Sequence, residues 1–339
     1  MRLLLCLTTA AVGLAGQAAA APYAARNAEV QNAAATLTVI AEDRSDIDVS
    51  VTAGARVAAP TVHVEGDRVV IDGGLRNRLR GCGTVMGVRQ VRINGIGAVP
   101  ASELPHITIH TPRTMHLGVG GAVFSEIGAS GGGDLALNGC GDASVGASSG
   151  DLNLALNGSG DAHVGRVQGR LNTALNGSGS LRVDGAGGTG NLVLNGSGDV
   201  VVGDVGGEVN ALVNGSGSMR VGDTGHDATV RLSGSGDIDV GAVRGSLSAQ
   251  LNGSGSVEVA SVEGDSADLS LSASGDLVVH GGRVARLEAD DNGSGDLRFG
   301  GSAASTRARL SSSGDIYIHD AGRFEQMIDT GSGDIHTPG

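Results

Sequence analysis

The chain has 339 residues, of which 60 are glycine, none is tryptophan, and only five are phenylalanine or tyrosine. Globular cores usually rely on aromatic side chains for much of their buried area, so this composition excludes a core of that kind and leaves leucine, valine, isoleucine and alanine to fill it. The formal charge of −13 is scattered along the sequence, which argues against nucleic acid or an anionic membrane as the partner.

Residues 1–21 have the features of a secretory signal peptide. Arg2 supplies a positive charge, residues 3–14 are largely apolar, and Ala18-Ala19-Ala20 provides small residues for cleavage. No later stretch is long and apolar enough for a transmembrane helix. We therefore expect an exported protein that is periplasmic, secreted or at the outer surface of a Gram-negative bacterium. The alanine-rich residues 22–35 are expected to be flexible.

Residues 36–120 contain short runs in which apolar and polar residues alternate, such as 37–40, 47–51 and 107–109. This alternation predicts strands, but no repeat is visible. We interpret 36–120 as an irregular, β-rich layer that caps one end of the structure formed by the rest of the chain. Within it, residues 75–99 are expected to form a loop that Cys82 ties down.

Residues 121–339 are filled by a repeat with a period of about 19 residues. Each unit carries the motif Gly-Ser-Gly-Asp or Gly-Ser-Gly-Ser or a close variant, and its second glycine serves as an anchor. The anchors are Gly141, Gly160, Gly179, Gly198, Gly217, Gly236, Gly255, Gly275, Gly295, Gly314 and Gly333, with Gly121 as a degenerate earlier member. Two short alternating runs separate successive anchors, as in Val200/Val202 and Val209-x-Ala211-x-Val213. The period of two predicts strands and excludes helices.

One such unit cannot bury its apolar face alone, so the units must stack. Stacking places equivalent strands about 4.8 Å apart in parallel sheets, and parallel connections are almost always right-handed. The sequence therefore predicts an all-β fold, a right-handed parallel β-helix (β-solenoid) with about 19 residues per coil.

A polar residue stands three positions before each anchor. It is asparagine at Asn138, Asn157, Asn176, Asn195, Asn214, Asn252 and Asn292, and serine or threonine in the other units. Each of these side chains can bond to the neighbouring coil, which predicts an internal amide ladder with hydroxyl replacements.

The residue after each anchor is aspartate or serine, and the last four are Asp276, Asp296, Asp315 and Asp334. Two interpretations compete. Aspartate and serine both cap backbone amides at tight turns, which explains why they interchange. Alternatively, the four consecutive carboxylates bind Ca²⁺, and the chain is a calcium-stabilised secreted β-roll. We favour capping and expect no cofactor.

Two further features bear on chemistry and stability. Asp290-Asp291 lies in a unit with one extra residue and is the best candidate acid pair for a polysaccharide-cleaving enzyme, although a bulged corner explains the extra residue more simply. No nucleophile motif or phosphate loop is present, so we expect no catalysis. Cys82 and Cys140 are the cysteines left after signal removal, and in an oxidising compartment we expect them to form a disulfide.

The tandem Gly-Ser-Gly-Asp-hydrophobic-x-Val units, preceded by a signal peptide and a strand-rich segment, resemble the auto-transporter adhesin family with a GIN head domain, a bacterial family of unknown function. The resemblance covers residues 36–339 and is most specific in 133–337. It implies a right-handed β-helix at the cell envelope or surface. We therefore expect a scaffold or adhesin-like protein that binds a surface or envelope ligand, either protein or glycan.

Overall fold

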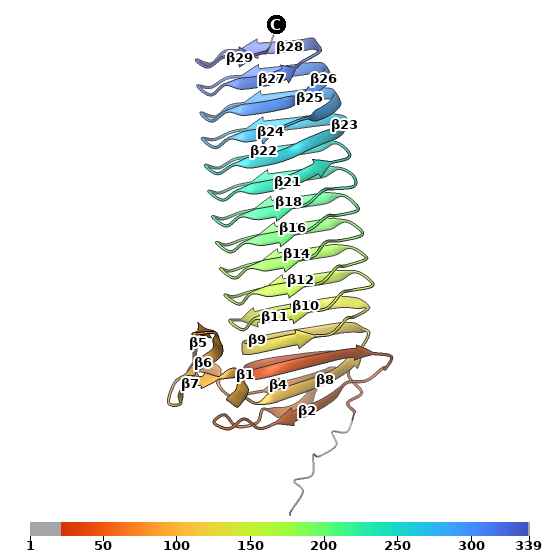
Figure 1. Ribbon diagram of the computed structural model, residues 1–339, viewed down its shortest axis with the longest axis vertical. Coiled ribbons are helices and arrows are strands. Elements are labelled where there is room, and N and C mark those ends of the chain that lie inside the picture. Colours follow the sequence, from red (N-terminus) through yellow and green to blue (C-terminus); the bar gives the residue numbers. More distant parts are fainter. Residues whose placement is uncertain (1–21, 338–339) are drawn as a thin grey trace, which may run out of the picture.

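The computed structural model describes residues 22–337, and the signal-peptide prediction for 1–21 lies outside them. The described chain forms a parallel β-solenoid of about 12 turns with a spacing of about 19 residues. Coils stack from β9 (Thr114–Ile127) at the base to β29 (Ile335–His336) at the far end (Figure 1). The predicted fold class is confirmed.

Each regular coil contains one short and one longer strand. The short strands are β11 (Ala143–Val145), β13 (Ala162–Val164), β15 (Leu181–Val183), β17 (Val200–Val202), β19 (Met219–Val221) and β24 (Leu277–Val279). The longer, five-residue strands are β12 (Leu152–Leu156), β14 (Leu171–Leu175), β16 (Gly190–Leu194), β18 (Val209–Val213), β20 (Ala228–Leu232) and β22 (Leu247–Leu251). Extended or terminal strands complete the solenoid: β10 (Gly132–Gly139), β21 (Ile238–Val243), β23 (Val257–Leu271), β25 (Gly282–Asp291), β26 (Leu297–Leu310), β27 (Ile316–Asp320) and β28 (Arg323–Asp329).

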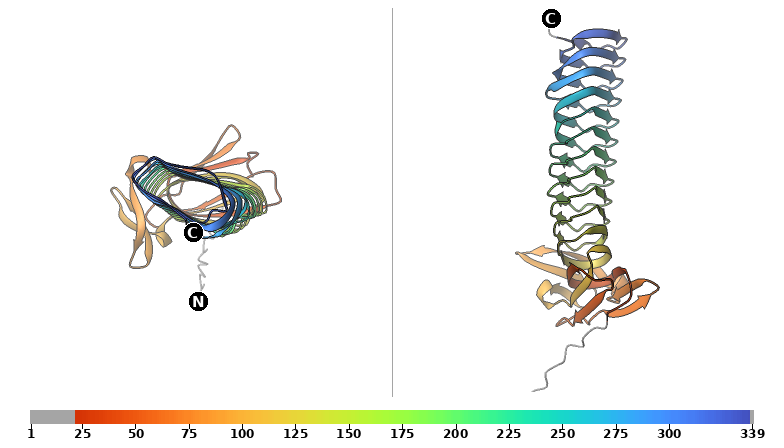
Figure 2. Two further views of the ribbon diagram at one scale, coloured as in Figure 1. Left: turned by 90° about the horizontal axis from the view of Figure 1, so that it is seen from above. Right: turned by 90° about the vertical axis from the view of Figure 1, so that its right-hand side faces the viewer.

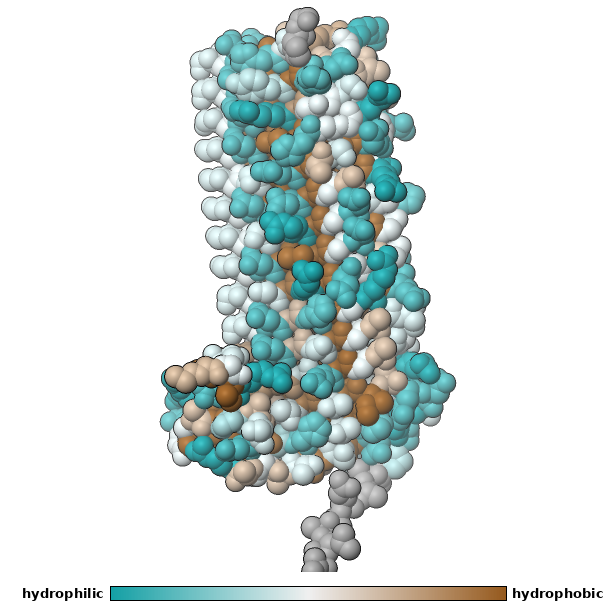
Figure 3. Space-filling view, viewed as in Figure 1, coloured by the Kyte–Doolittle hydropathy of each residue, from teal (hydrophilic) through white to brown (hydrophobic). Residues whose placement is uncertain are grey.

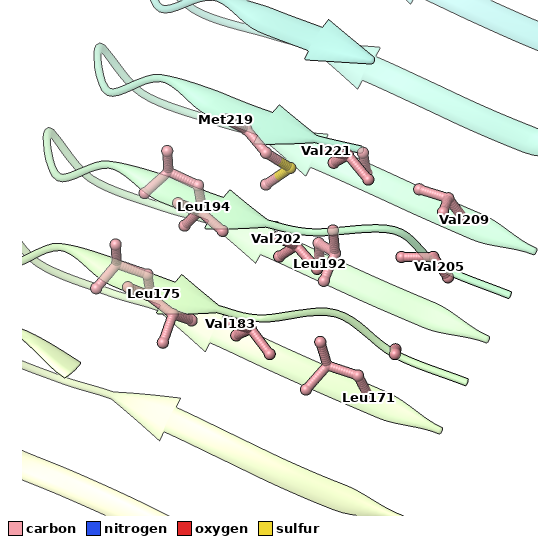
Figure 4. Close-up of a cluster of buried hydrophobic side chains, with 14 of the residues drawn as sticks. Leu171, Leu175, Val183, Leu192, Leu194, Val202, Val205, Val209, Met219 and Val221 are labelled. Carbon is pink, nitrogen blue, oxygen red and sulfur yellow. The ribbon is translucent and has the colours of Figure 1, made fainter. Parts of the chain in front are cut away.

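The register aligns equivalent residues of successive coils. Leu152 pairs with Leu171, and Leu171 with Gly190, so each residue lies beside the same position of the next repeat unit. Inward side chains such as Leu171, Leu192 and Val209 are fully buried and form aliphatic columns along the axis (Figure 4). Each fully buried aliphatic side chain contributes about 1.5–3 kcal/mol, so the stack is stable without an aromatic core.

Glycine at the corners permits the close stacking. A Cβ added at Gly196 would lie 2.0 Å from the carbonyl oxygen of Gly177 in the coil below. That same oxygen accepts hydrogen bonds from the backbone N–H of Ser197, at 3.0 Å, and of Gly198, at 3.3 Å. A side chain at this corner would push apart two coils that backbone hydrogen bonds hold together.

The N-terminal layer differs from the prediction in its first strand. That strand is β1 (Asn27–Glu42), and the other strands of the layer pack around it. They are β2 (Asp48–Thr52), β3 (Thr61–Glu65), β4 (Arg68–Asp72) and β8 (His106–Pro112). β1 pairs in parallel with β9 on one side and with β4 and β8 on the other. Ala33 and Ala35 are consequently buried, so the expectation that residues 22–35 are flexible is wrong for 27–35.

The solenoid also begins earlier than predicted. β9 starts at Thr114, ahead of the predicted boundary at residue 121, and pairs in parallel with β10. In that register Gly121 lies opposite Gly139 and Val123 lies against the anchor Gly141. Val123, and not Gly121, therefore occupies the anchor position in β9. The interval from Val123 to the anchor Gly141 is shorter than the intervals between the later anchors.

Residues 75–99 form a small sheet where we predicted a loop. A short 3₁₀ turn (Arg76–Arg78) leads into β5 (Leu79–Val85), which pairs antiparallel with β6 (Val88–Ile93), and β6 pairs with β7 (Gly97–Pro100). A second 3₁₀ turn (Ala101–Glu103) returns the chain to β8. This three-stranded sheet projects sideways from the base of the solenoid (Figure 2).

The last coil limits the exposed edge that it offers. β28 pairs with β26, and its register shifts at Glu325, which is the signature of a β-bulge. Asp329 occupies the register position of buried Leu310, so a charged group replaces an apolar one at the end of a core column. Bulges and inward-pointing charges both discourage edge-to-edge pairing.

Candidate binding surface

The predicted asparagine row forms a hydrogen-bonded ladder across five coils. The amide nitrogen of each asparagine donates to the side-chain oxygen of the one below, from Asn214 through Asn195, Asn176 and Asn157 to Asn138, at 2.7–3.0 Å. Asn252 and Asn292 stand alone between hydroxyl residues, and the Ser311 hydroxyl donates to Asn292. The ladder is exposed. Its prediction as internal is therefore wrong: these side chains turn outward at the corner where the inward strand positions end.

A second asparagine ladder runs parallel to the first and was not predicted. Asn210 donates to Asn191, Asn191 to Asn172, Asn172 to Asn153, and Asn153 to a carboxylate oxygen of Asp134, at 2.6–3.1 Å. These residues occupy the first outward position of the five-residue strands. Their recurrence every 19 residues, at Asn153, Asn172, Asn191 and Asn210, is the sequence signal for this ladder.

Between the two ladders lies a groove with a floor of small apolar side chains. The floor is formed by the second outward position of each strand, Ala136, Ala155, Ala174 and Val193. The groove has a volume of about 740 Å³. Because the floor residues are small, a flat, extended ligand can approach the backbone of several coils at once.

Paired charges close the groove at its N-terminal end. His116 Nδ1 lies 2.7 Å from Asp134 Oδ2, and Arg68 forms an ion pair with Glu29. The amide of Asn153 and then the His116 ring hold the pKa of Asp134 below its usual value. Asp134 is hydrogen-bonded to Asn153 and His116 at this end, and beyond it the wall of the groove presents amide groups.

Each rung of the ladders retains unused hydrogen-bonding capacity. An asparagine amide has two donor hydrogens and two acceptor lone pairs on its oxygen, and the ladder uses one donor and one acceptor. The remaining donor and acceptor of each rung are available to a ligand. They recur about every 4.8 Å along the axis.

The aspartate row caps backbone amides. The carboxylate of one coil accepts the N–H of the equivalent residue in the next, at 2.9 Å from Asp296 to Asp276, 3.3 Å from Asp315 to Asp296, and 2.9 Å from Asp334 to Asp315. The same bond occurs where serine follows, as from Ser180 to Asp161 at 2.7 Å. In residues 22–337, no group of three or more potential metal ligands is assembled.

Two side chains also engage this row near the C-terminal end. Arg298 donates to Asp296 at 2.8 Å, and the Tyr317 hydroxyl donates to Asp315 at 2.9 Å. The backbone N–H of Asp334, followed by the Tyr317 hydroxyl, lowers the pKa of Asp315. Both carboxylate oxygens of Asp296 and of Asp315 thus accept hydrogen bonds from the protein.

Asp290 and Asp291 do not form an acid pair. They are consecutive residues of β25, so their side chains point to opposite faces of the strand. Asp291 is fully buried, opposite Leu271 and Leu310 of the adjacent coils, and its Oδ1 accepts the Gly293 N–H at 2.7 Å. Burial raises the pKa of Asp291. A substrate cannot reach this carboxyl group, which lies inside the core.

Cys82 and Cys140 are joined by a disulfide, as the sequence predicted, with their Cα atoms 5.6 Å apart. The bond connects β5 of the projecting sheet to the first glycine corner of the solenoid. Beneath it, Val91, Ile93 and Phe124 form a small core of their own. The projecting sheet is therefore fixed to the solenoid by a covalent link and by packing.

A known family matches this architecture. The family described as "Putative auto-transporter adhesin, head GIN domain" matches residues 103–242 and again 242–337. The chain belongs to this family. The match begins just before β8 of the N-terminal layer and extends through the last described coil, so the head GIN domain includes both asparagine ladders and the floor of the groove. No curated protein matches the chain. Within residues 22–337, the head GIN domain has no helix of the length and apolar character needed to cross a bilayer.

Proposed function

We propose that this chain is an exported, non-catalytic, adhesin-like binding protein of the bacterial envelope, whose groove holds an extended, neutral, hydroxyl-rich ligand such as a glycan chain. The observation that carries the proposal is the groove of about 740 Å³ that the second asparagine ladder and a floor of small apolar side chains line. The family description is consistent with a binding role.

The chemistry of the rungs favours hydroxyl groups. A sugar hydroxyl both donates and accepts a hydrogen bond, and each asparagine rung offers one free donor and one free acceptor. The regular spacing lets a polymer with repeating hydroxyls form equivalent contacts on several coils. No Phe, Tyr or Trp side chain lines the groove in the described residues, so single contacts are weak and affinity depends on how many rungs are engaged at once.

Binding to a panel of neutral polysaccharides tests the proposal. Ala174→Arg places a long side chain on the groove floor and is expected to abolish binding. Val278→Arg is the matched control, because Val278 is an outward residue of β24, away from the groove. Binding by wild type and Val278→Arg, little affected by salt, supports the proposal. Failure of every neutral glycan to bind, or equal binding by Ala174→Arg, refutes it.

A further inference from the structure

The hairpin of β5 and β6 ends in an exposed apolar tip. Val85 and Val88 expose 53% and 51% of their surface, and Met86 between them exposes 99%. The hairpin projects from the base of the solenoid (Figures 1 and 2), and apolar surface covers the outer end of the projection in Figure 3. An apolar tip that packs against nothing gains no stability from burial.

The turn at this tip adds a local cost. Met86 has a φ of 51° and Gly87 a φ of 79°, so both central residues of the turn have positive φ. Such turns favour Asn-Gly or Asp-Gly, and a methionine with positive φ is strained. Strained backbone conformations of this kind are concentrated at functional sites. The hairpin has a large apolar side chain at its outermost position despite the strain, which favours a binding role for the tip.

The charge around the tip is opposite to that of the chain as a whole. Residues 75–100 contain five arginines and no acidic residue, in a chain whose formal charge is −13. All five are exposed, and none forms an ion pair with another described residue. They are Arg76, Arg78, Arg80, Arg89 and Arg92. The net negative charge of the whole chain argues against binding to anionic surfaces, but this argument does not apply to the projecting sheet, which is positively charged.

Two of these arginines line a hollow on the outer face of the small sheet. The hollow has a volume of about 280 Å³ and is lined by Arg80, Arg92 and Gln90, with Gly81 and Gly83 on the adjacent strand. A Cβ added at either glycine would contact nothing within 4 Å, so the glycines leave this space open. Val85 of the tip borders the same hollow. Guanidinium groups are well suited to phosphate oxygens because their donors form a planar fork.

We propose that this hairpin docks the protein on an anionic lipid bilayer. Val85, Met86 and Val88 enter the interface, and Arg80 and Arg92 hold lipid phosphate groups in the hollow above them. An apolar tip bordered by cationic side chains combines the two forces that retain proteins at membrane surfaces. A soluble polyanion would satisfy the arginines and leave the apolar tip in water, which favours a bilayer. The disulfide and the Val91–Phe124 core hold the hairpin rigid enough to bear the solenoid.

The absence of tryptophan from the chain provides a direct reporter. Met86→Trp places a single tryptophan at the tip, and Met327→Trp, at a residue 49% exposed in β28, is the matched control at the other end. With vesicles of phosphatidylglycerol and phosphatidylcholine at low salt, we expect the Met86→Trp emission to shift to the blue and the Met327→Trp emission to stay unchanged. No shift at residue 86, or equal shifts at both residues, overturns the proposal.

The arginines are tested in the same background. Arg80→Gln with Arg92→Gln is expected to weaken binding to anionic vesicles roughly tenfold, and vesicles of phosphatidylcholine alone are expected to bind little. Unchanged binding by this double variant overturns the phosphate site. Binding to dextran sulfate without any tip-emission shift on vesicles also overturns the proposal, since it identifies a soluble polyanion as the partner. Ala174→Arg should bind vesicles normally, so the outcome is independent of the glycan groove.

Discussion

Replacing the buried Asp291 by asparagine should stabilise the protein at neutral pH. The Oδ1 atom of Asp291 accepts a hydrogen bond from Gly293, whereas Oδ2 is buried and its neighbouring donor, the Ser312 hydroxyl, makes no hydrogen bond of normal geometry to it. Leaving such an atom unpaired costs about 1–3 kcal/mol, and more when it is charged. Asparagine retains the acceptor for the Gly293 N–H and removes the charge. We therefore expect Asp291→Asn to raise the free energy of unfolding by about 1–3 kcal/mol at neutral pH.

Leucine at this position illustrates why asparagine is the better test. Leu271 and Leu310 lie opposite Asp291 in the adjacent coils, and one more buried leucine would contribute about 1.5–3 kcal/mol. The Gly293 N–H would then lose its acceptor, at a cost of about 1–3 kcal/mol. The two effects offset each other, so the sign of Asp291→Leu is not diagnostic.

The pH dependence follows from the raised pKa of Asp291. The folded state binds this proton more tightly than the unfolded state, so the group's contribution to stability is greatest below the unfolded pKa. That contribution falls as the pH rises through the folded pKa. At about pH 3 and below, the carboxyl is largely protonated in both states, and wild type and Asp291→Asn should be close in stability. The gap should widen toward about pH 7.5.

Urea denaturation at several pH values measures this gap from the midpoints, provided that the slopes are unchanged. Asp290→Asn is the control, since the neighbouring side chain lies on the opposite, outer face of β25. A destabilised Asp291→Asn at neutral pH would refute the reasoning. A gain that is the same at all pH values would show that the charge of Asp291 has no part in it.

Three further predictions test the scaffold. Gly196→Ala should lower the free energy of unfolding by about 1–3 kcal/mol, because relieving the 2.0 Å contact with the Gly177 oxygen breaks or lengthens two backbone hydrogen bonds. Ser197→Ala is the control, and equal stability of the two variants contradicts the stacking argument. The double variant Cys82→Ser, Cys140→Ser should lower the free energy of unfolding by about 4 kcal/mol, the loop-closure term for a separation of 58 residues. A denaturation midpoint equal to that of the oxidised wild type would show that the disulfide does not stabilise the protein. EDTA and added Ca²⁺ should both leave the melting temperature unchanged, because the aspartate row already accepts backbone amides; a higher melting temperature in Ca²⁺ would restore the calcium interpretation.

The repeating part of the fold was predictable because each repeat unit contains the whole sequence pattern that specifies one coil. A glycine anchor, two alternating runs and a corner asparagine, serine or threonine recur in every unit, and their stacking follows from the need to bury one apolar face. The exposure of the asparagine ladder was not predictable from the spacing, because a ladder can form on either side of the wall. The second ladder starting at Asp134 needed the register of the strands, since its asparagines lie outside the conspicuous glycine motif.

The N-terminal layer was less predictable because its contacts are distant in sequence. Alanine has weak strand propensity, yet Ala33 and Ala35 form part of a strand that lies between β9 and β8, both of which come much later in the chain. Residues 75–99 were expected to form a loop because of their glycines and arginines. Those same residues form the hairpin turn and its basic faces once Cys82 is bonded to the solenoid.

Every regular coil of the solenoid pairs its strands only with the coils before and after it. A duplication or deletion of one repeat unit would therefore create a single new junction between coils, keep the other interfaces, and change the height of the molecule by about 4.8 Å. The gene can adjust, in fixed increments, how far the far tip stands from the projecting hairpin. Reach is thus a quantity that selection can tune by changing the contacts at one junction only.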